Sequence, residues 1–248
     1  MTSTHLVPPF INPSCLADSL KKHGFGILNP SSLSSFLECP LPELMSLKTY
    51  WDDLLPDNFL KDGGHYRWRR HSCFIVEQES VKQVAHRAHY QPLKYNALHG
   101  GMHRLFEPMN DHIVGQPVWS KLLLAIARIC SSIRGEQPWS VEAHQFRIDT
   151  RNGIGRPTPE GAHRDGVDFV AIMLVARENV SGGESRIFEA KGPHGQRFTL
   201  SEPWTLLLLD DQRVIHESTP IQPTAEGGHR DTLVLTFRSS NFLGSTDE

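Results

Sequence analysis

Residues 161–186, GAHRDGVDFVAIMLVARENVSGGESR, decide the fold. The stretch begins with a polar His-x-Asp pair, His163 and Asp165, and continues into a long apolar run typical of a buried β-strand. If the strand starts by His163, the two side chains project to one face, because side chains two apart along a strand share a face. An imidazole and a carboxylate placed in this way can bind one metal ion, so we expect a third ligand from elsewhere in the chain.

His216 is the candidate for that third ligand, because it follows the apolar segment 204–209 near the end of another predicted strand. Two histidines and one carboxylate on one face, with open positions opposite, form the ligand set of non-haem Fe(II) oxygenases. The chain has 14 histidines, so a His-x-Asp pair is weak on its own, and a second pair, His229 and Asp231, has no histidine after it. A hydrogen-bonded pair without metal, and a core or surface role for His216, are the competing interpretations.

The second half of the chain predicts a β-rich core. From about 141 to 238, short apolar segments alternate with turn signals and no segment has helical spacing, which is typical of a β-sandwich or jelly-roll barrel. Helical spacing is clear at 118–133, where apolar residues recur on one face. At 248 residues the chain fits a single domain, 1–248, that is mainly β with flanking helices. We expect 1–140 to be a largely helical and mixed flank and 141–238 to be the jelly-roll core.

The composition excludes several classes of protein. Hydrophobic residues make up 38% and charged residues 21%, as in a globular chain, and the net charge of −3 gives no support for nucleic acid as a partner. The four cysteines show no Cys-x-x-Cys spacing, which indicates reduced thiols. No signal peptide or apolar span of membrane length is apparent, so we expect a cytoplasmic protein without membrane contact. The oligomeric state stays open.

Arginine and amide side chains mark possible anion-binding walls. Arg67, Arg69 and Arg70 surround a tryptophan at the start of a predicted strand, where the first two would share a face. A solvated edge, a carboxylate-binding wall and a nucleic-acid surface are three interpretations, the last disfavoured by the acidic balance. Gln145 and Arg147 share the polar face of the strand before the metal motif, and generic strand positions remain the alternative for both.

The ordered set His163-x-Asp165, His216 and Arg230 resembles the iron- and 2-oxoglutarate-dependent dioxygenase superfamily, whose fold is a double-stranded β-helix (jelly roll, cupin-like). The resemblance implies an enzyme that uses Fe(II), 2-oxoglutarate as cosubstrate and O2, with ascorbate as reductant in vitro. It implies that the three ligands bind Fe(II) and that Arg230, whose planar fork matches a carboxylate, pairs with the distal end of 2-oxoglutarate. Thr232 shares the face of Arg230 and would donate its hydroxyl to the same group. No catalytic residue is expected beyond the iron centre.

Two further segments, Gly182-Gly183-Glu184 and 228–237, are similar to the branch that contains bacterial isoleucine hydroxylase and related oxygenases of free aliphatic amino acids. This resemblance implies oxidation of an unactivated C–H bond of a small amino acid, with 2-oxoglutarate decarboxylated to succinate and CO2. The outcome would be hydroxylation, or desaturation or oxidative cyclisation such as aziridine formation, as in secondary metabolite biosynthesis.

The segment 144–147 also resembles that branch, so we expect Gln145 to contact the cosubstrate. Arg147, or Arg67, Arg69 and Arg70, would bind the substrate carboxylate. Two alternatives remain open. One is an oxygenase of the same fold that acts on a peptide, a modified base or another secondary metabolite, and the other is a non-redox, cupin-like metal-binding protein.

Overall fold

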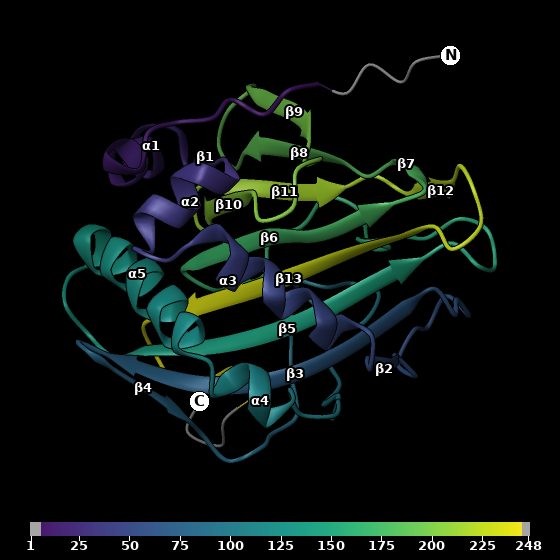
Figure 1. Ribbon diagram of the computed structural model, residues 1–248, viewed down its shortest axis with the longest axis horizontal. Coiled ribbons are helices and arrows are strands. Elements are labelled where there is room, and N and C mark those ends of the chain that lie inside the picture. Colours follow the sequence, from purple (N-terminus) through teal and green to yellow (C-terminus); the bar gives the residue numbers. More distant parts are fainter. Residues whose placement is uncertain (1–5, 245–248) are drawn as a thin grey trace.

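A computed structural model describes residues 6–244 and shows a large antiparallel sheet with helices over one face and two small sheets against the other (Figure 1). The order of the large sheet is β1-β10-β6-β13-β5-β3-β2, with β4 paired to β3. Its strands are β1 (Phe25–Leu28), β2 (Leu55–Pro56), β3 (Arg67–Glu77), β4 (Ser80–Gln83), β5 (Trp139–Asp149), β6 (Phe169–Glu178), β10 (Leu206–Asp210) and β13 (His229–Arg238).

The small sheets complete a jelly roll. One has the order β11-β8-β9 and the other pairs β12 with β7. Their strands are β7 (Val180–Gly182), β8 (Glu184–Glu189), β9 (Gly195–Thr199), β11 (Val214–Ser218) and β12 (Ile221–Pro223). The helical elements are η1 (Pro13–Cys15), α1 (Leu16–His23), α2 (Pro30–Phe36), α3 (Leu41–Ser46), η2 (Leu47–Trp51), α4 (Asp111–Val114) and α5 (Pro117–Arg134). The fold is mainly β with flanking helices, as the sequence predicts.

Side chains on the large sheet alternate between a helix-covered face and a cavity face. On β13, Leu233, Leu235 and Phe237 join the hydrophobic core beneath the helices. The alternate residues Arg230, Thr232, Val234 and Thr236 line a cavity on the other face. This period of two is the ordinary consequence of strand geometry, and it decides which polar residues of each strand can reach a ligand.

The helix α5 forms where the apolar spacing predicts it. Pro117 stands in its first turn, where the missing N–H costs nothing, and Gly135 follows its last residue at φ +90°. Leu122, Ile126 and Cys130 recur at helical spacing and are fully buried against the sheet. The prediction of a core helix over 118–133 is therefore confirmed.

The metal motif does not lie on a strand, and that expectation is wrong. β6 begins only at Phe169, and His163 takes part in an isolated antiparallel bridge with His216. The backbone between His163 and Phe169 is bent, with Gly166 at φ +80°. The Asp165 N–H points to a side chain and not to a neighbouring strand. Before Phe169, the backbone N–H groups of residues 165–167 donate to the Asp211 side chain instead of to a neighbouring strand.

The first half of the chain supplies strands to the core as well as helices. β1 pairs with β10, and β3 pairs with β5 over ten residue pairs, from Arg67–Ile148 to Val76–Trp139. The segment 1–140 is therefore more than a helical and mixed flank. β5 needs a hydrogen-bonding partner on each side, and β13 supplies only one of them.

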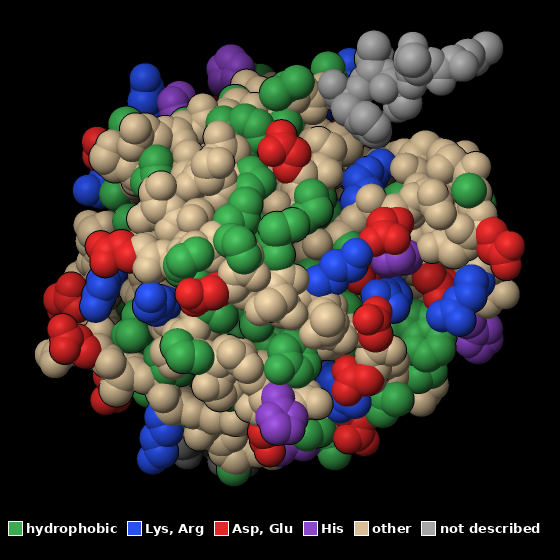
Figure 2. Space-filling model, viewed as in Figure 1, with side chains coloured by type: hydrophobic (Ala, Val, Ile, Leu, Met, Phe, Trp, Pro, Cys, Tyr) green, Lys and Arg blue, Asp and Glu red, His purple; other side chains and the backbone are tan. Residues whose placement is uncertain are grey.

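Within residues 6–244, no helix combines the length and apolar character needed to cross a membrane. The face shown in Figure 2 lies over the helices, and acidic and basic side chains are interspersed on it without a continuous basic patch. This face therefore gives no support for a polyanionic partner.

Candidate metal centre and active-site cavity

His163, Asp165 and His216 meet at the rim of the cavity. Their ligand atoms all lie within 4.8 Å of one another. His163 Nε2 is 3.7 Å from Asp165 Oδ1, and His216 Nε2 is 3.6 Å from Asp165 Oδ2. Two backbone hydrogen bonds, of 3.0 and 2.9 Å, join His163 to His216 on β11. The bridge thus brings together the loop before β6 and a strand of the small sheet.

Hydrogen bonds around the triad orient two of its members. His163 Nδ1 lies 3.0 Å from the carbonyl oxygen of Gly161, so this nitrogen donates and Nε2 is left free to bind a metal. Gln91 Nε2 donates to Asp165 Oδ1 at 2.9 Å, which holds the carboxylate beside both imidazoles. The donor set of two imidazoles and one carboxylate fits Fe(II).

The protonation states follow from burial and from charges within the triad. Burial lowers the pKa of His216 to about 4, and the charge of His163 adds to this effect. Burial also opposes charge on His163, but the carboxylates of Asp165 and Glu160 outweigh it and raise the pKa of His163 to about 9. Burial would raise the pKa of Asp165, yet the two imidazoles lower it to about 2. A metal ion at this site would therefore displace a proton from His163 at neutral pH.

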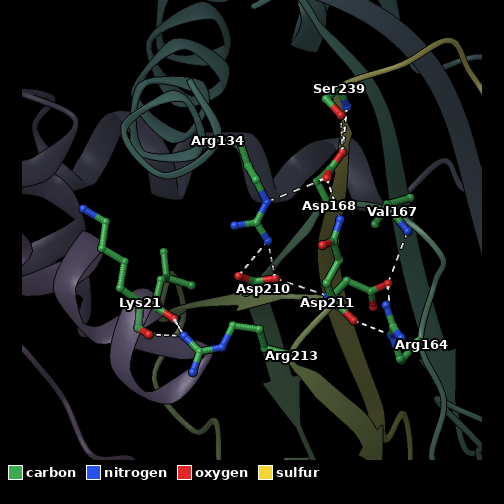
Figure 3. Close-up of polar contacts among 11 residues, drawn as sticks. Lys21, Arg134, Arg164, Val167, Asp168, Asp210, Asp211, Arg213 and Ser239 are labelled. Carbon is green, nitrogen blue, oxygen red and sulfur yellow. Dashed lines mark hydrogen bonds and ion pairs between the residues drawn. The ribbon is translucent and has the colours of Figure 1, made fainter. Parts of the chain in front are cut away.

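A buried carboxylate, Asp211, holds the loop that carries Asp165 (Figure 3). Asp211 accepts backbone N–H bonds from Asp165 at 3.0 Å, Gly166 at 2.8 Å and Val167 at 3.2 Å. Arg164 donates to its backbone carbonyl at 2.5 Å. Burial, followed by the nearby charge of Asp165, raises the pKa of Asp211 to about 7. The turn also needs Gly166, since a Cβ there would meet the Tyr95 ring at 2.3 Å.

Replacing Asp211 by asparagine is expected to weaken Fe(II) binding about tenfold, the scale of losing an outer partner of a metal ligand. The amide nitrogen would face N–H donors that the carboxylate now accepts, so the loop would lose part of its support. Anaerobic calorimetric titration with Fe(II) measures the effect. Asp210→Asn is the matched control, because Asp210 binds Arg134 at 2.8 and 2.9 Å instead of the loop (Figure 3). Equal Fe(II) affinity in both variants would contradict the role given to Asp211.

Arg230 is a buried guanidinium without an anionic partner among the residues that the structure describes. It is 4% exposed and lines the cavity from β13 together with Thr232. Within residues 6–244 its Nε has no hydrogen-bond partner and no carboxylate lies within ion-pair distance of the group. Burial lowers the pKa of Arg230 to about 10, and the charge of Arg177 adds to this effect. A buried charge left unpaired is costly, so the site fits an anionic ligand such as the far carboxylate of 2-oxoglutarate.

Gly183 makes room for this pair of arginines. A Cβ at Gly183 would lie 2.9 Å from Arg177 Nη1 and 3.6 Å from Arg230 Cδ, and the residue has φ +65°. In the Gly182-Gly183-Glu184 segment, glycine is therefore needed at 183 because a larger side chain would collide with Arg177 and crowd Arg230.

Two of the predicted substrate-binding arginines reach the cavity. Arg67 Nε donates to Asp57 Oδ2 at 2.7 Å, and its Nη2 has no partner within the described part of the chain. Arg69 lies between the rings of Phe106 and Phe146, at 3.7 and 4.4 Å from their centroids. Both guanidiniums are largely engaged by protein groups before any ligand binds.

Three other predicted residues lie on the opposite face of the sheet. Gln145 donates to the Tyr50 carbonyl at 3.1 Å, and Arg147 forms two 2.8 Å bonds with Asp231. Arg70 donates to the Pro108 carbonyl at 2.9 Å. None of the three lines the cavity. Strand alternation places them toward the helices, so the structure gives no support for their contact with cosubstrate or substrate.

Sequence reasoning missed a second cluster of histidines around Glu142. Its Oε2 lies 3.0 Å from His71 Nε2, 2.5 Å from His89 Nδ1 and 3.6 Å from His144 Nε2. Arg69 Nη2 lies 2.7 Å from His144 Nδ1 and can only donate, so the proton of this neutral imidazole sits on Nε2 and faces Glu142. His71 and His89 thus anchor Glu142 by hydrogen bonds, and the ligand atoms of the four side chains also lie within 4.8 Å of one another, close enough to share a metal ion. The histidines come from segments too far apart for a sequence motif.

A His/Asp/His group beside a cavity with an unpaired buried guanidinium is the arrangement of a non-haem iron oxygenase. The chain belongs to the 2OG-Fe dioxygenase family, whose model matches residues 48–236. It is accordingly an enzyme whose family uses Fe(II), 2-oxoglutarate and O2. A search of curated proteins finds no match.

Several solved structures share the fold of this chain. The crystal structure of a bsmA homolog from Methylobium petroleophilum PM1 has a TM-score of 0.90 and 50% identity, over 97% of this chain and 98% of that chain. IDO from Bacillus thuringiensis matches with a TM-score of 0.75 and 18% identity, over 93% and 100% of the two chains. The Fe(II)/α-ketoglutarate-dependent dioxygenase TqaL matches with a TM-score of 0.72 and 18% identity, over 95% and 90%. The last two similarities show the fold alone.

Proposed function

We propose that this enzyme oxidises an unactivated C–H bond of a small free aliphatic amino acid. The product is a hydroxylated amino acid, or a desaturated or cyclised one such as an aziridine. In this proposal His163, Asp165 and His216 bind Fe(II), and Arg230 with Thr232 binds the distal carboxylate of 2-oxoglutarate. With O2, the bound iron and cosubstrate supply the oxidising power, and 2-oxoglutarate leaves as succinate and CO2.

The observation that carries the proposal is the mixed character of the cavity beside the triad. Its lining joins charged groups of both signs to aliphatic and aromatic side chains. Arg67 and Arg104 contribute cations, and Glu142 and Glu160 contribute carboxylates. Aliphatic surface is supplied by Val167, Ile172 and Leu207, among others. A free aliphatic amino acid carries both charges and an apolar side chain, so it matches all three kinds of lining.

The protein's own part is to bind and orient the substrate. Fixed charges hold the polar end of a small molecule, and the apolar wall then determines which C–H bond lies nearest the metal. Whether abstraction of hydrogen leads to an alcohol, an alkene or a ring depends on this pose. The unpaired Arg230 inside the cavity matches the distal carboxylate of 2-oxoglutarate, which favours the oxygenase over the cupin-like alternative.

The test is succinate release from 2-oxoglutarate with Fe(II), ascorbate and O2, across a panel of free aliphatic amino acids with product masses recorded. We expect one or a few amino acids to stimulate release and to gain one oxygen or lose two hydrogens. Slow release that no amino acid stimulates would reject the substrate class and keep the dioxygenase. Stimulation by a peptide but not by its free amino acids would favour the peptide alternative.

A further inference from the structure

Arg104 is a second buried guanidinium in the cavity, and no carboxylate of residues 6–244 pairs with it. It is 2% exposed, and within residues 6–244 its guanidinium makes one long hydrogen bond, from Nη2 to Gln91 Oε1 at 3.4 Å. Its Nε has no partner there. Burial and the neighbouring Arg67 lower the pKa of Arg104 to about 10. Like Arg230, this group is placed for an anion that the described part of the chain does not supply.

Glu160 is the complementary case, a largely buried carboxylate with one oxygen that has no partner in the described part of the chain. Its side chain is 12% exposed, and its Oε2 has no hydrogen bond within the described part of the chain. Its Oε1 lies 3.6 Å from His163 Nε2. That nitrogen is the one free to bind the metal, so a metal ion at the triad would replace the His163 proton and end this ion pair. Glu160 is then left to meet a cationic group from outside the chain.

The two residues flank the triad from separate loops. Gln91 connects Arg104 to the metal carboxylate, since it accepts from Arg104 at 3.4 Å and donates to Asp165 at 2.9 Å. Glu160 stands three residues before His163 in the loop before β6. The charges acting on Arg104 include Glu160, whereas those acting on Arg230 are Arg177 and Asp231. Arg104 and Arg230 therefore serve different parts of the cavity.

We propose that Arg104 binds the α-carboxylate and Glu160 the α-ammonium of the substrate, an inference that rests on the proposed function. A free amino acid carries both charges on one carbon, so it neutralises both buried groups at once. An amide or an N-acyl derivative would leave one of them buried and unpaired, which disfavours these analogues. Arg67 can add a hydrogen bond from its free Nη2, but its charge is already paired with Asp57. Arg104 and Glu160 are thus specificity residues for the polar end of the substrate.

The test compares Arg104→Met and Glu160→Gln in the full chain. The probes are the amino acid that best stimulates the wild-type enzyme, its primary amide and its N-acetyl derivative. We expect Arg104→Met to lower kcat/KM for the free amino acid roughly 100-fold, the effect of truncating one partner of a buried charge pair, and to leave the amide nearly unchanged. Glu160→Gln should act in the same way on the free amino acid and spare the N-acetyl derivative. Calorimetric titration of the amino acid into the Ni(II)- and 2-oxoglutarate-loaded protein gives the same comparison without turnover.

Control variants distinguish loss of substrate binding from a general effect on folding or net charge. Arg197→Met on β9 and Glu189→Gln on β8 remove the same charges from exposed positions, where changes of about twofold or less are expected. Succinate release without amino acid reports whether metal and cosubstrate still bind. If Arg104→Met or Glu160→Gln loses that release, Arg104→Lys and Glu160→Asp replace them in the comparison, because they keep the charge. Stimulation that persists equally in both variants overturns the assignment while the proposed function stands. If no amino acid stimulates the wild-type enzyme while basal release continues, the proposed function and this inference fall together.

Discussion

Replacing His216 by alanine is expected to lower Fe(II) affinity and iron-dependent succinate release by more than about 100-fold, because even outer partners of metal ligands cost up to that factor. The change leaves one imidazole and one carboxylate at the triad. The backbone bonds between residues 163 and 216 do not involve the side chain, so the bridge and the fold should persist. Anaerobic calorimetry with Fe(II) measures the affinity, and circular dichroism checks the fold.

The matched control is His229→Ala, in the second His-x-Asp pair of the chain. His229 Nε2 lies 3.8 Å from Asp231, on the opposite face of β13 from Arg230, and its Nδ1 lies 2.8 Å from the Gly227 carbonyl. This variant should keep Fe(II) affinity and turnover. Retained iron-dependent turnover in His216→Ala, or equal loss in both variants, would be incompatible with the assignment of the triad.

Replacing Arg230 by methionine is expected to raise the Kd for 2-oxoglutarate at least about 30-fold, the lower end of the cost of truncating a buried charge pair. Fe(II) affinity should stay unchanged, because the triad does not contact Arg230. The free energy of unfolding of the metal-free protein should hold or rise, since the variant removes a buried charge that has no partner in the described chain. Titration with 2-oxoglutarate and thermal unfolding of the apoprotein measure the two effects.

A cosubstrate analogue makes this prediction more specific. 2-Oxovalerate lacks the distal carboxylate, so the wild-type enzyme should prefer 2-oxoglutarate strongly and Arg230→Met should lose most of that preference. Thr232→Val, which removes only a hydroxyl, should weaken 2-oxoglutarate binding by about tenfold or less. If Arg230→Met kept the wild-type preference for 2-oxoglutarate over 2-oxovalerate, another group would bind the distal carboxylate.

Some features of the molecule follow from local sequence. The apolar run after the His-x-Asp pair specifies a buried strand, and the helical spacing at 118–133 specifies α5, because both patterns reflect which side chains must leave water. The chemistry of the metal donors is equally local, and the resemblance of the ordered set to the dioxygenase superfamily predicts His163, Asp165 and His216 as the ligand set. The fold brings the three together.

Other features depend on contacts that sequence patterns do not encode. Gln145 and Arg147 lie on the polar face of β5 in sequence terms, yet that face packs beneath the helices, and the opposite face with Glu142 and His144 lines the cavity. Periodicity distinguishes the two faces of a strand but does not say which one meets a ligand. Which face of β5 lines the cavity depends on which side of the large sheet the helices cover and which side the small sheets cover.

The sequence by itself determined the metal chemistry, the β-rich core and the arginine on the last strand, because residue type and strand or helix period carry that information locally. Only the tertiary structure decided that the metal loop is held by Asp211, that Gln145, Arg147 and Arg70 face away from the site, and that Arg104 and Glu160 reach it. The physical reason is that these roles come from long-range burial and from the partners that each buried charge finds or lacks in the folded chain.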